Sequence, residues 1–411
     1  MKETEKMKKV VRMLLFAGVL VLTKPVTVAA DTYKTDRFLH QETGNIVQIS
    51  EIENESGQAD TYLEDMTGMV DFSELDDFME EETVSMSFSE LFDIFLQDGV
   101  SEETLSSVVT WIKDALFGEI QRNQKLLIEI VILAFFFSIL KNFAGVFDSA
   151  YIADLCFILV YCVLALMLLT SFQSFQQTAE EALQKGVDFM KALVPTFCLS
   201  MVFSSNISSS AGFYQMAYFV IYLVEWIFLY VLLPMVHIYV ILEIFNHFML
   251  EERLTNLTEL FRDIIQWGIK TATVAVMGLN VVQNLISPAK DRLTQGTLGR
   301  AAAVVPGVGG AISGVGEMVL GAGIVVKSCV GVAGLVALVV IGAAPILKIV
   351  CLTFFYKLAA AVTEPVTDKR ICGCLKGMSE GALLYMKLVA YGLILFFVTI
   401  GLTTASTGYI Y

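Results

Sequence analysis

Four ionisable residues stand inside or beside long apolar segments of the chain. They are Asp154, Glu225, Glu317 and Lys348. A charge that faces lipid costs about 3 kcal/mol or more, so such residues normally face protein or water. They are therefore candidates for a polar path or gate through a membrane, and passive charge pairing is the alternative. Glu129, Lys327 and Lys387 lie nearer to the ends of apolar segments, where a side chain can reach the interface.

The histidines offer little for catalysis or metal binding. Glu243 and His247 are four residues apart and share a helical face, but no third converging ligand is evident. The chain contains neither an HExxH motif nor the Ser-containing elbow of hydrolases. Val326 stands where a phosphate-binding loop requires glycine before Lys327 and Ser328. We therefore expect no enzymatic activity and no bound cofactor or metal.

Residues 296–342 are rich in glycine. The glycines that we expect to pack helices or to line a pore are Gly307, Gly309, Gly310, Gly314, Gly316 and Gly321. The four-residue spacing of Gly310 and Gly314 places both on one helix face, where another backbone can approach closely. A broken helix or a re-entrant hairpin beside a cavity are the alternatives. Gly373, Gly377 and Gly381 repeat this spacing before the last apolar segment.

The elements that carry these residues are predicted to be membrane-spanning helices. A span needs about 20 apolar residues, and most of the apolar segments approach or exceed this length. They cover residues 126–143, 151–172, 189–203, 211–233, 235–250, 271–286, 301–326, 329–356 and 383–402. Pro195 makes 189–203 a candidate re-entrant segment, and Pro234 separates two of the expected spans. We expect an all-α polytopic membrane protein with six to eight crossings, its membrane domain covering residues 121–411.

The region before the first span has a different character. Residues 1–30 are typical of a signal peptide, with a basic start, a short apolar core and small residues before the expected cleavage site. Residues 31–85 form an acidic segment that we expect to lie outside the cytoplasm and to be partly disordered. Residues 86–120 are predicted to form two amphipathic helices. Ser87 and Glu90 form a capping box before the first, and Ser101 opens the second.

Two loops between expected spans are basic, and this suggests an orientation. Their basic residues are Lys290, Arg292 and Arg300 in one loop, and Lys357, Lys369, Arg370 and Lys376 in the other. The positive-inside rule would place both loops in the cytoplasm and the C-terminus outside.

Several stretches resemble the stage III sporulation protein AE family of endospore-forming bacteria. They include Trp111-Ile112-Lys113, Asn123-Gln124-Lys125-Leu126-Leu127, Phe189-Met190-Lys191-Ala192-Leu193-Val194-Pro195, Ser208-Ser209-Ser210-Ala211, and Val304-Val305-Pro306-Gly307-Val308-Gly309-Gly310-Ala311-Ile312-Ser313 with Leu320-Gly321 and Val325-Val326-Lys327. The resemblance covers roughly residues 88–402. Gly307 departs from it, since the family usually has a bulkier residue there.

The resemblance implies a multi-pass protein of the mother-cell membrane around the forespore. It would belong to a channel complex with the sister stage III A proteins and the forespore stage II Q protein, powered by a separate ATPase. Such a protein would support forespore development without catalytic residues of its own, and it could form a homo-oligomer. The alternative is a secondary transporter, in which Asp154, Glu225 and a broken helix near Pro306 would form a midplane site.

Overall fold

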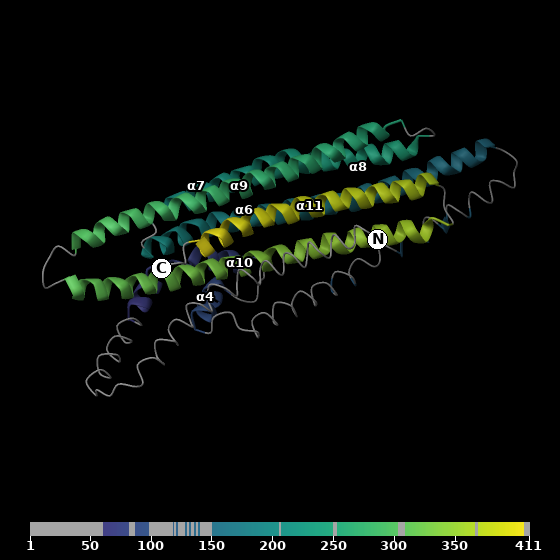
Figure 1. Ribbon diagram of the computed structural model, residues 1–411. Helices are drawn as coiled ribbons and strands as arrows, with labels where there is room; N and C mark the ends of the chain where they lie inside the picture. The colour runs from purple at the N-terminus through teal and green to yellow at the C-terminus, as the bar shows by residue number, and fades with distance from the viewer. Residues whose placement is uncertain are drawn as a thin grey trace, which may run out of the picture.

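The computed structural model describes residues 61–81, 87–97, 150–204, 207–249, 253–302, 309–365 and 369–406, with scattered positions between 118 and 139. Every regular element in these ranges is helical (Figure 1). They are α3 (Ser73–Glu81), α4 (Phe88–Gln97), α6 (Ala150–Phe203), α7 (Ile207–Leu223), the π-helix η2 (Val224–Leu232), α8 (Leu233–Phe248), α9 (Thr255–Ala302), α10 (Gly309–Thr363) and α11 (Lys369–Ser406). The expected all-α class is confirmed for the described ranges.

Four helices in these ranges are long and apolar enough to cross a membrane. They are Tyr161–Phe203, Ser209–Phe248, Val319–Thr363 and Lys369–Ala405. Fewer spans are found here than the six to eight expected. Several expected pairs are single rods, the expected span 126–143 lies largely outside the described residues, and α9, which contains 271–286, is not among the candidates. Residues 151–172 and 189–203 both belong to α6, and most of 301–326 joins 329–356 in α10.

Prolines do not interrupt these rods. Pro195 lies inside α6 and Pro345 lies inside α10. Pro234 lies in the first turn of α8, directly after η2. The expectations that 189–203 is re-entrant and that Pro234 separates two spans are therefore wrong. Neighbouring helices and local adjustments can satisfy the backbone groups that a proline frees, and η2 is such an adjustment.

Consecutive rods of the bundle run in opposite directions. Phe203 at the end of α6 packs beside Gly323 near the start of α10, and Ser171, 32 positions earlier in α6 (203 − 171), accepts a 2.6 Å hydrogen bond from Tyr356 near the end of α10. The bundle therefore has two ends. One end, called here the α8–α9 end, contains the α8–α9 connection, the α10–α11 connection and the start of α6. The α6–α7 end holds the α6–α7 and α9–α10 connections and the end of α11.

The two basic loops lie at opposite ends of this bundle. Arg292 and Arg300 lie in the last turns of α9, which lead to the start of α10. Lys369 and Arg370 begin α11, directly after α10 has crossed the bundle. A single continuous α10 cannot return to the side it left, so the expectation that both loops lie in the cytoplasm is wrong.

Part of the acidic N-terminal region is folded onto the bundle. The capping box that begins α4 is confirmed: the Ser87 amide donates to Glu90 Oε2 at 3.0 Å, and the Glu90 amide donates to Ser87 Oγ at 3.1 Å. In α3, the Phe78 ring lies 5.8 Å from the Phe189 ring of α6. Residues 31–85 were expected to be partly disordered; within them residues 61–81 are folded, and buried apolar side chains such as Leu75 anchor this part, while 31–60 and 82–85 are outside the described residues. The second amphipathic helix lies outside the described residues.

Candidate functional site: a polar cluster between α8, α9 and α11

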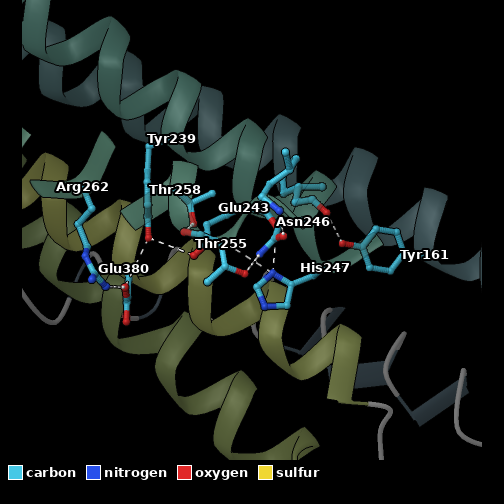
Figure 2. A network of polar contacts seen from close by, with 11 residues as sticks. Tyr161, Tyr239, Glu243, Asn246, His247, Thr255, Thr258, Arg262 and Glu380 are labelled. Atoms are coloured by element: carbon cyan, nitrogen blue, oxygen red, sulfur yellow. Dashed lines mark hydrogen bonds and ion pairs between the residues drawn. The ribbon is translucent and has the colours of Figure 1, made fainter. Parts of the chain in front are cut away.

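A ladder of polar side chains faces out of α8 toward its neighbours near the α8–α9 end. Tyr239, Glu243 and His247 follow one another at intervals of four residues, so they share one side of the helix. Arg262 reaches the same place from α9, and Glu380 reaches it from α11 (Figure 2). The site therefore depends on three helices that are far apart in the sequence.

Two carboxylates meet at one hydroxyl. The Tyr239 hydroxyl lies 3.3 Å from Oε1 of Glu243 and 3.4 Å from Oε2 of Glu380, so it can donate to either (Figure 2). Arg262 approaches the same Glu380 oxygen at 3.3 Å and forms an ion pair with it. The arginine balances one of the two negative charges and leaves the tyrosine shared between them.

His247 closes the cluster against α11. Its Nδ1 lies 2.9 Å from the backbone oxygen of Glu243, which can only accept, so Nδ1 carries the proton. The same nitrogen lies 3.8 Å from the Glu243 carboxylate. The other ring nitrogen, Nε2, lies 2.5 Å from the place where Gly373 would carry a Cβ atom. Only glycine at 373 therefore leaves room for the ring.

The turn after α8 is fastened to the same region. The Asn246 side chain accepts a hydrogen bond from the Leu254 amide at 2.8 Å and donates one to Thr255 Oγ1 at 3.1 Å. From α6, the Tyr161 hydroxyl donates to the Ile244 backbone oxygen at 2.6 Å. These bonds fix the ends of three rods relative to one another, which fixes the position of the ladder.

The arrangement suits interhelical contacts and charge pairing better than it suits catalysis. Among the residues that the structure describes, no three His, Cys, Asp or Glu side chains converge to hold a metal ion. The Glu243 and His247 side chains are 14% exposed, whereas Glu380 is 51% exposed. The cluster thus joins an inner pair of titratable groups to an outer pair through Tyr239.

The charges singled out from the sequence do not form one site. Glu225 begins η2 and pairs with Lys191 of α6 at 3.7 Å, while Lys348 is half-buried in α10. Asp154 lies 37 positions before Lys191 on the same helix (191 − 154), or about 55 Å at 1.5 Å per residue. The expected midplane site of Asp154 and Glu225 is therefore wrong. Glu317 lies on α10, and its side chain and that of Asp154 are outside the described residues.

The glycines predicted from the 296–342 run are only partly visible. Gly307 lies outside the described residues. The backbone of Gly309, Gly310, Gly314 and Gly316 is part of α10, but the structure does not describe what surrounds them. Gly321 is half-buried. Their packing or pore-lining role stays a prediction. Close contacts occur further along the same run, at Gly323 and Gly331.

Comparison with known proteins identifies the family. The sequence model of stage III sporulation protein AE matches residues 86–407. The chain belongs to this family. Stage III sporulation protein AE of Bacillus subtilis (strain 168) is 26% identical over 309 residues, which cover 74% of this chain and 77% of the relative. No solved structure matches the chain.

The stage III sporulation protein AE match covers α4 to α11 and leaves α3 outside. The polar cluster therefore lies in the part of the chain that the family model matches. Sequence analysis did not single out Tyr239, Arg262 or Glu380 as members of a site. The available signal was the four-residue spacing of Tyr239, Glu243 and His247 opposite the equal spacing of Gly373 and Gly377. The family's name is that of a sporulation protein and not of an enzyme, and the apolar rods make it a membrane protein.

Proposed function

We propose that this chain is a membrane-embedded structural subunit of the channel complex that links the mother cell and the forespore. The family match supports a role in sporulation, and one physical feature supports a role within a larger assembly. The four candidate spans are helices of 37 to 45 residues, or about 55–70 Å at 1.5 Å per residue.

These rods are longer than a bilayer needs. The hydrocarbon core is about 30 Å thick, and a helix tilted by 40° spans it in about 40 Å. Large apolar side chains are nevertheless exposed along the whole α7–η2–α8 rod, from Ile207 at 64% to Phe245 at 55%. The part of the rod outside lipid must be covered by other protein, because proteins rarely expose so large a continuous apolar surface to water. A subunit packed between partners satisfies this requirement.

The folded N-terminal helices suggest an orientation. The Thr196 hydroxyl of α6 donates to the backbone oxygen of Asp71, next to α3, and Phe197 at the same level lies beside Gly331. Gly331 also contacts Thr404, near the end of α11. If residues 1–30 export the acidic segment, the α6–α7 end and the C-terminus lie outside the cytoplasm with it. The basic start of α11 then lies inside, as the positive-inside rule favours, whereas Arg292 and Arg300 at the end of α9 lie outside.

The partners proposed from the family are the sister stage III A proteins and the forespore stage II Q protein. The acidic N-terminal region would meet them in the space between the two membranes, and a separate ATPase would supply energy. A secondary transporter is less well supported, because Asp154 and Glu225 lie far apart, while Pro306, where its broken helix was expected, is outside the described residues.

The test is deletion of the gene in the organism that carries it. We expect development to stall after engulfment, and expression of the full chain in trans should restore spore yield. Epitope-tagged full chain purified from sporulating cells in mild detergent should carry the sister stage III A proteins with it. Normal spore yield without the gene, or purification of the chain without any of these proteins, would contradict the proposal.

A further inference from the structure

Five aromatic residues form a stripe on the outer surface of α7 and η2. They recur every four residues and are exposed by 38% to 69%: Tyr214, Tyr218, Tyr222, Trp226 and Tyr230. The Tyr214 and Tyr218 rings are in contact, with centroids 4.6 Å apart. Exposed aromatics at such regular spacing are typical of an interaction surface, because Tyr and Trp contribute most of the binding energy in many interfaces.

The π-helix turns the later part of this stripe back toward the face on which it begins. In an α-helix of 3.6 residues per turn, each four-residue step rotates a side chain about 40° around the axis, so Tyr214 to Tyr222 drift by about 80°. In a π-helix of roughly 4.4 residues per turn, each such step rotates it about 30° the other way. The steps from Tyr222 to Tyr230 fall mostly within η2 (Val224–Leu232). The stripe therefore returns to its original face.

The stripe lies at the level of an acidic helix. The Phe213 ring beside Tyr214 packs edge-on against Phe197 of α6 at 4.9 Å, and α3 contacts α6 close by through Phe78 and Phe189. Glu74 of α3 is an electrostatic neighbour of Tyr218. The nine residues of α3 include five acidic and no basic side chains. Such a helix does not lie in hydrocarbon, so the end of the stripe that holds Tyr214 and Tyr218 is outside the lipid core.

We propose that the aromatic stripe is a dimerisation surface that binds the same stripe of a second copy of this chain. A parallel two-fold arrangement sets equal levels of two rods side by side, so each tyrosine meets its own counterpart. Evenly spaced rings can interdigitate and stack in that geometry.

Charge favours a second copy over an acidic or basic partner. Glu225 is the only charged residue between positions 207 and 232. It is already paired with Lys191 of the same chain at 3.7 Å. An uncharged face meets itself without repulsion, whereas it offers nothing to balance the charge of a strongly charged partner.

The experiment is photo-crosslinking of the full chain in membranes of sporulating cells. The crosslinking amino acid benzoylphenylalanine replaces Tyr214, Tyr218 or Tyr230 in separate variants. Val274 on α9, exposed by 71%, is the matched control position. We expect all three stripe positions to give an adduct of two copies of the 45.3 kDa chain, and Val274 to give none. Adducts with lipid or with another protein only, or no adduct at the stripe, would overturn the proposal.

A second variant tests whether the stripe itself binds. Tyr222→Ala should lower the two-copy adduct formed from Tyr218 about tenfold, because truncating a central aromatic typically costs more than 1 kcal/mol of binding. Trp267→Ala on α9 removes a ring of similar exposure (68%) and should leave the adduct unchanged. Membrane levels of each variant show that it folds. Equal adduct yields from Tyr222→Ala and Trp267→Ala would also overturn the proposal.

Discussion

Two of the close contacts that glycines make between helices of the bundle differ in what the glycine faces. At Gly323 of α10, an added Cβ would lie 2.5 Å from the backbone carbonyl carbon of Phe203 and 2.8 Å from the Ser204 amide nitrogen. At Gly373 of α11, it would meet the His247 ring. One glycine admits another backbone, and the other admits an ionisable side chain.

The two contacts differ in whether the group opposite the glycine can move aside when a larger residue replaces the glycine. A backbone at a helix end cannot move aside without moving the helix, whereas a histidine ring can rotate or be removed. The α10 contact should therefore be the more rigid of the two. The α8–α11 contact can be altered from either helix, because a substitution of Gly373 or of His247 changes it.

The largest effect is expected at the backbone contact. Gly323→Ala should destabilise the chain by about 1–3 kcal/mol, since the added methyl group overpacks a site that cannot relax. The measurement is the thermal unfolding midpoint of the full chain in detergent. Gly278→Ala on α9 is the matched control, because an added Cβ there has nothing within 4 Å. It should be neutral or stabilising by up to about 1 kcal/mol. Equal midpoints for the two variants would remove the distinction.

Local sequence rules predicted the features that a few neighbouring residues determine. The capping box of Ser87 and Glu90 is complete because both partners lie within one turn. The spacing of Gly373, Gly377 and Gly381 indicated close approach, and α8 side chains do approach all three glycines. Spacing alone did not indicate which side chains would approach, because the partner helix is set by the tertiary fold.

The features that the sequence did not predict depend on distant contacts. Pro195 was expected to turn its segment back and Pro234 to separate two spans, but bundle packing keeps both rods continuous. Glu225 was treated as a path residue, yet it pairs with Lys191, which had not been singled out. In the polar cluster, Arg262 and Glu380 are 118 positions apart, and no local pattern joins them.

An intermediate effect is expected at the polar contact. Gly373→Ala should destabilise the chain by about 1–2 kcal/mol, because the methyl group overlaps the His247 ring. The double variant with His247→Ala should recover part of this loss, which would show as a coupling energy in a double-mutant cycle of unfolding midpoints. Additive losses would mean that Gly373, like Gly323, is limited by backbone, and the contrast between the two contacts would fail.

The smallest effect is expected at the outer edge of the polar cluster. Glu380→Gln removes the charge that Arg262 pairs with at 3.3 Å but keeps an oxygen for the Tyr239 hydroxyl. Arg262 and Glu380 are 34% and 51% exposed, so solvent and salt screen the pair, and the loss should be about 0–1 kcal/mol. The unfolding midpoints of the parent and the variant should differ at low salt and become equal at high salt. A larger, salt-independent loss would mean that Glu380 holds α8, α9 and α11 together as strongly as the glycine contacts do, because only a desolvated charge pair resists screening.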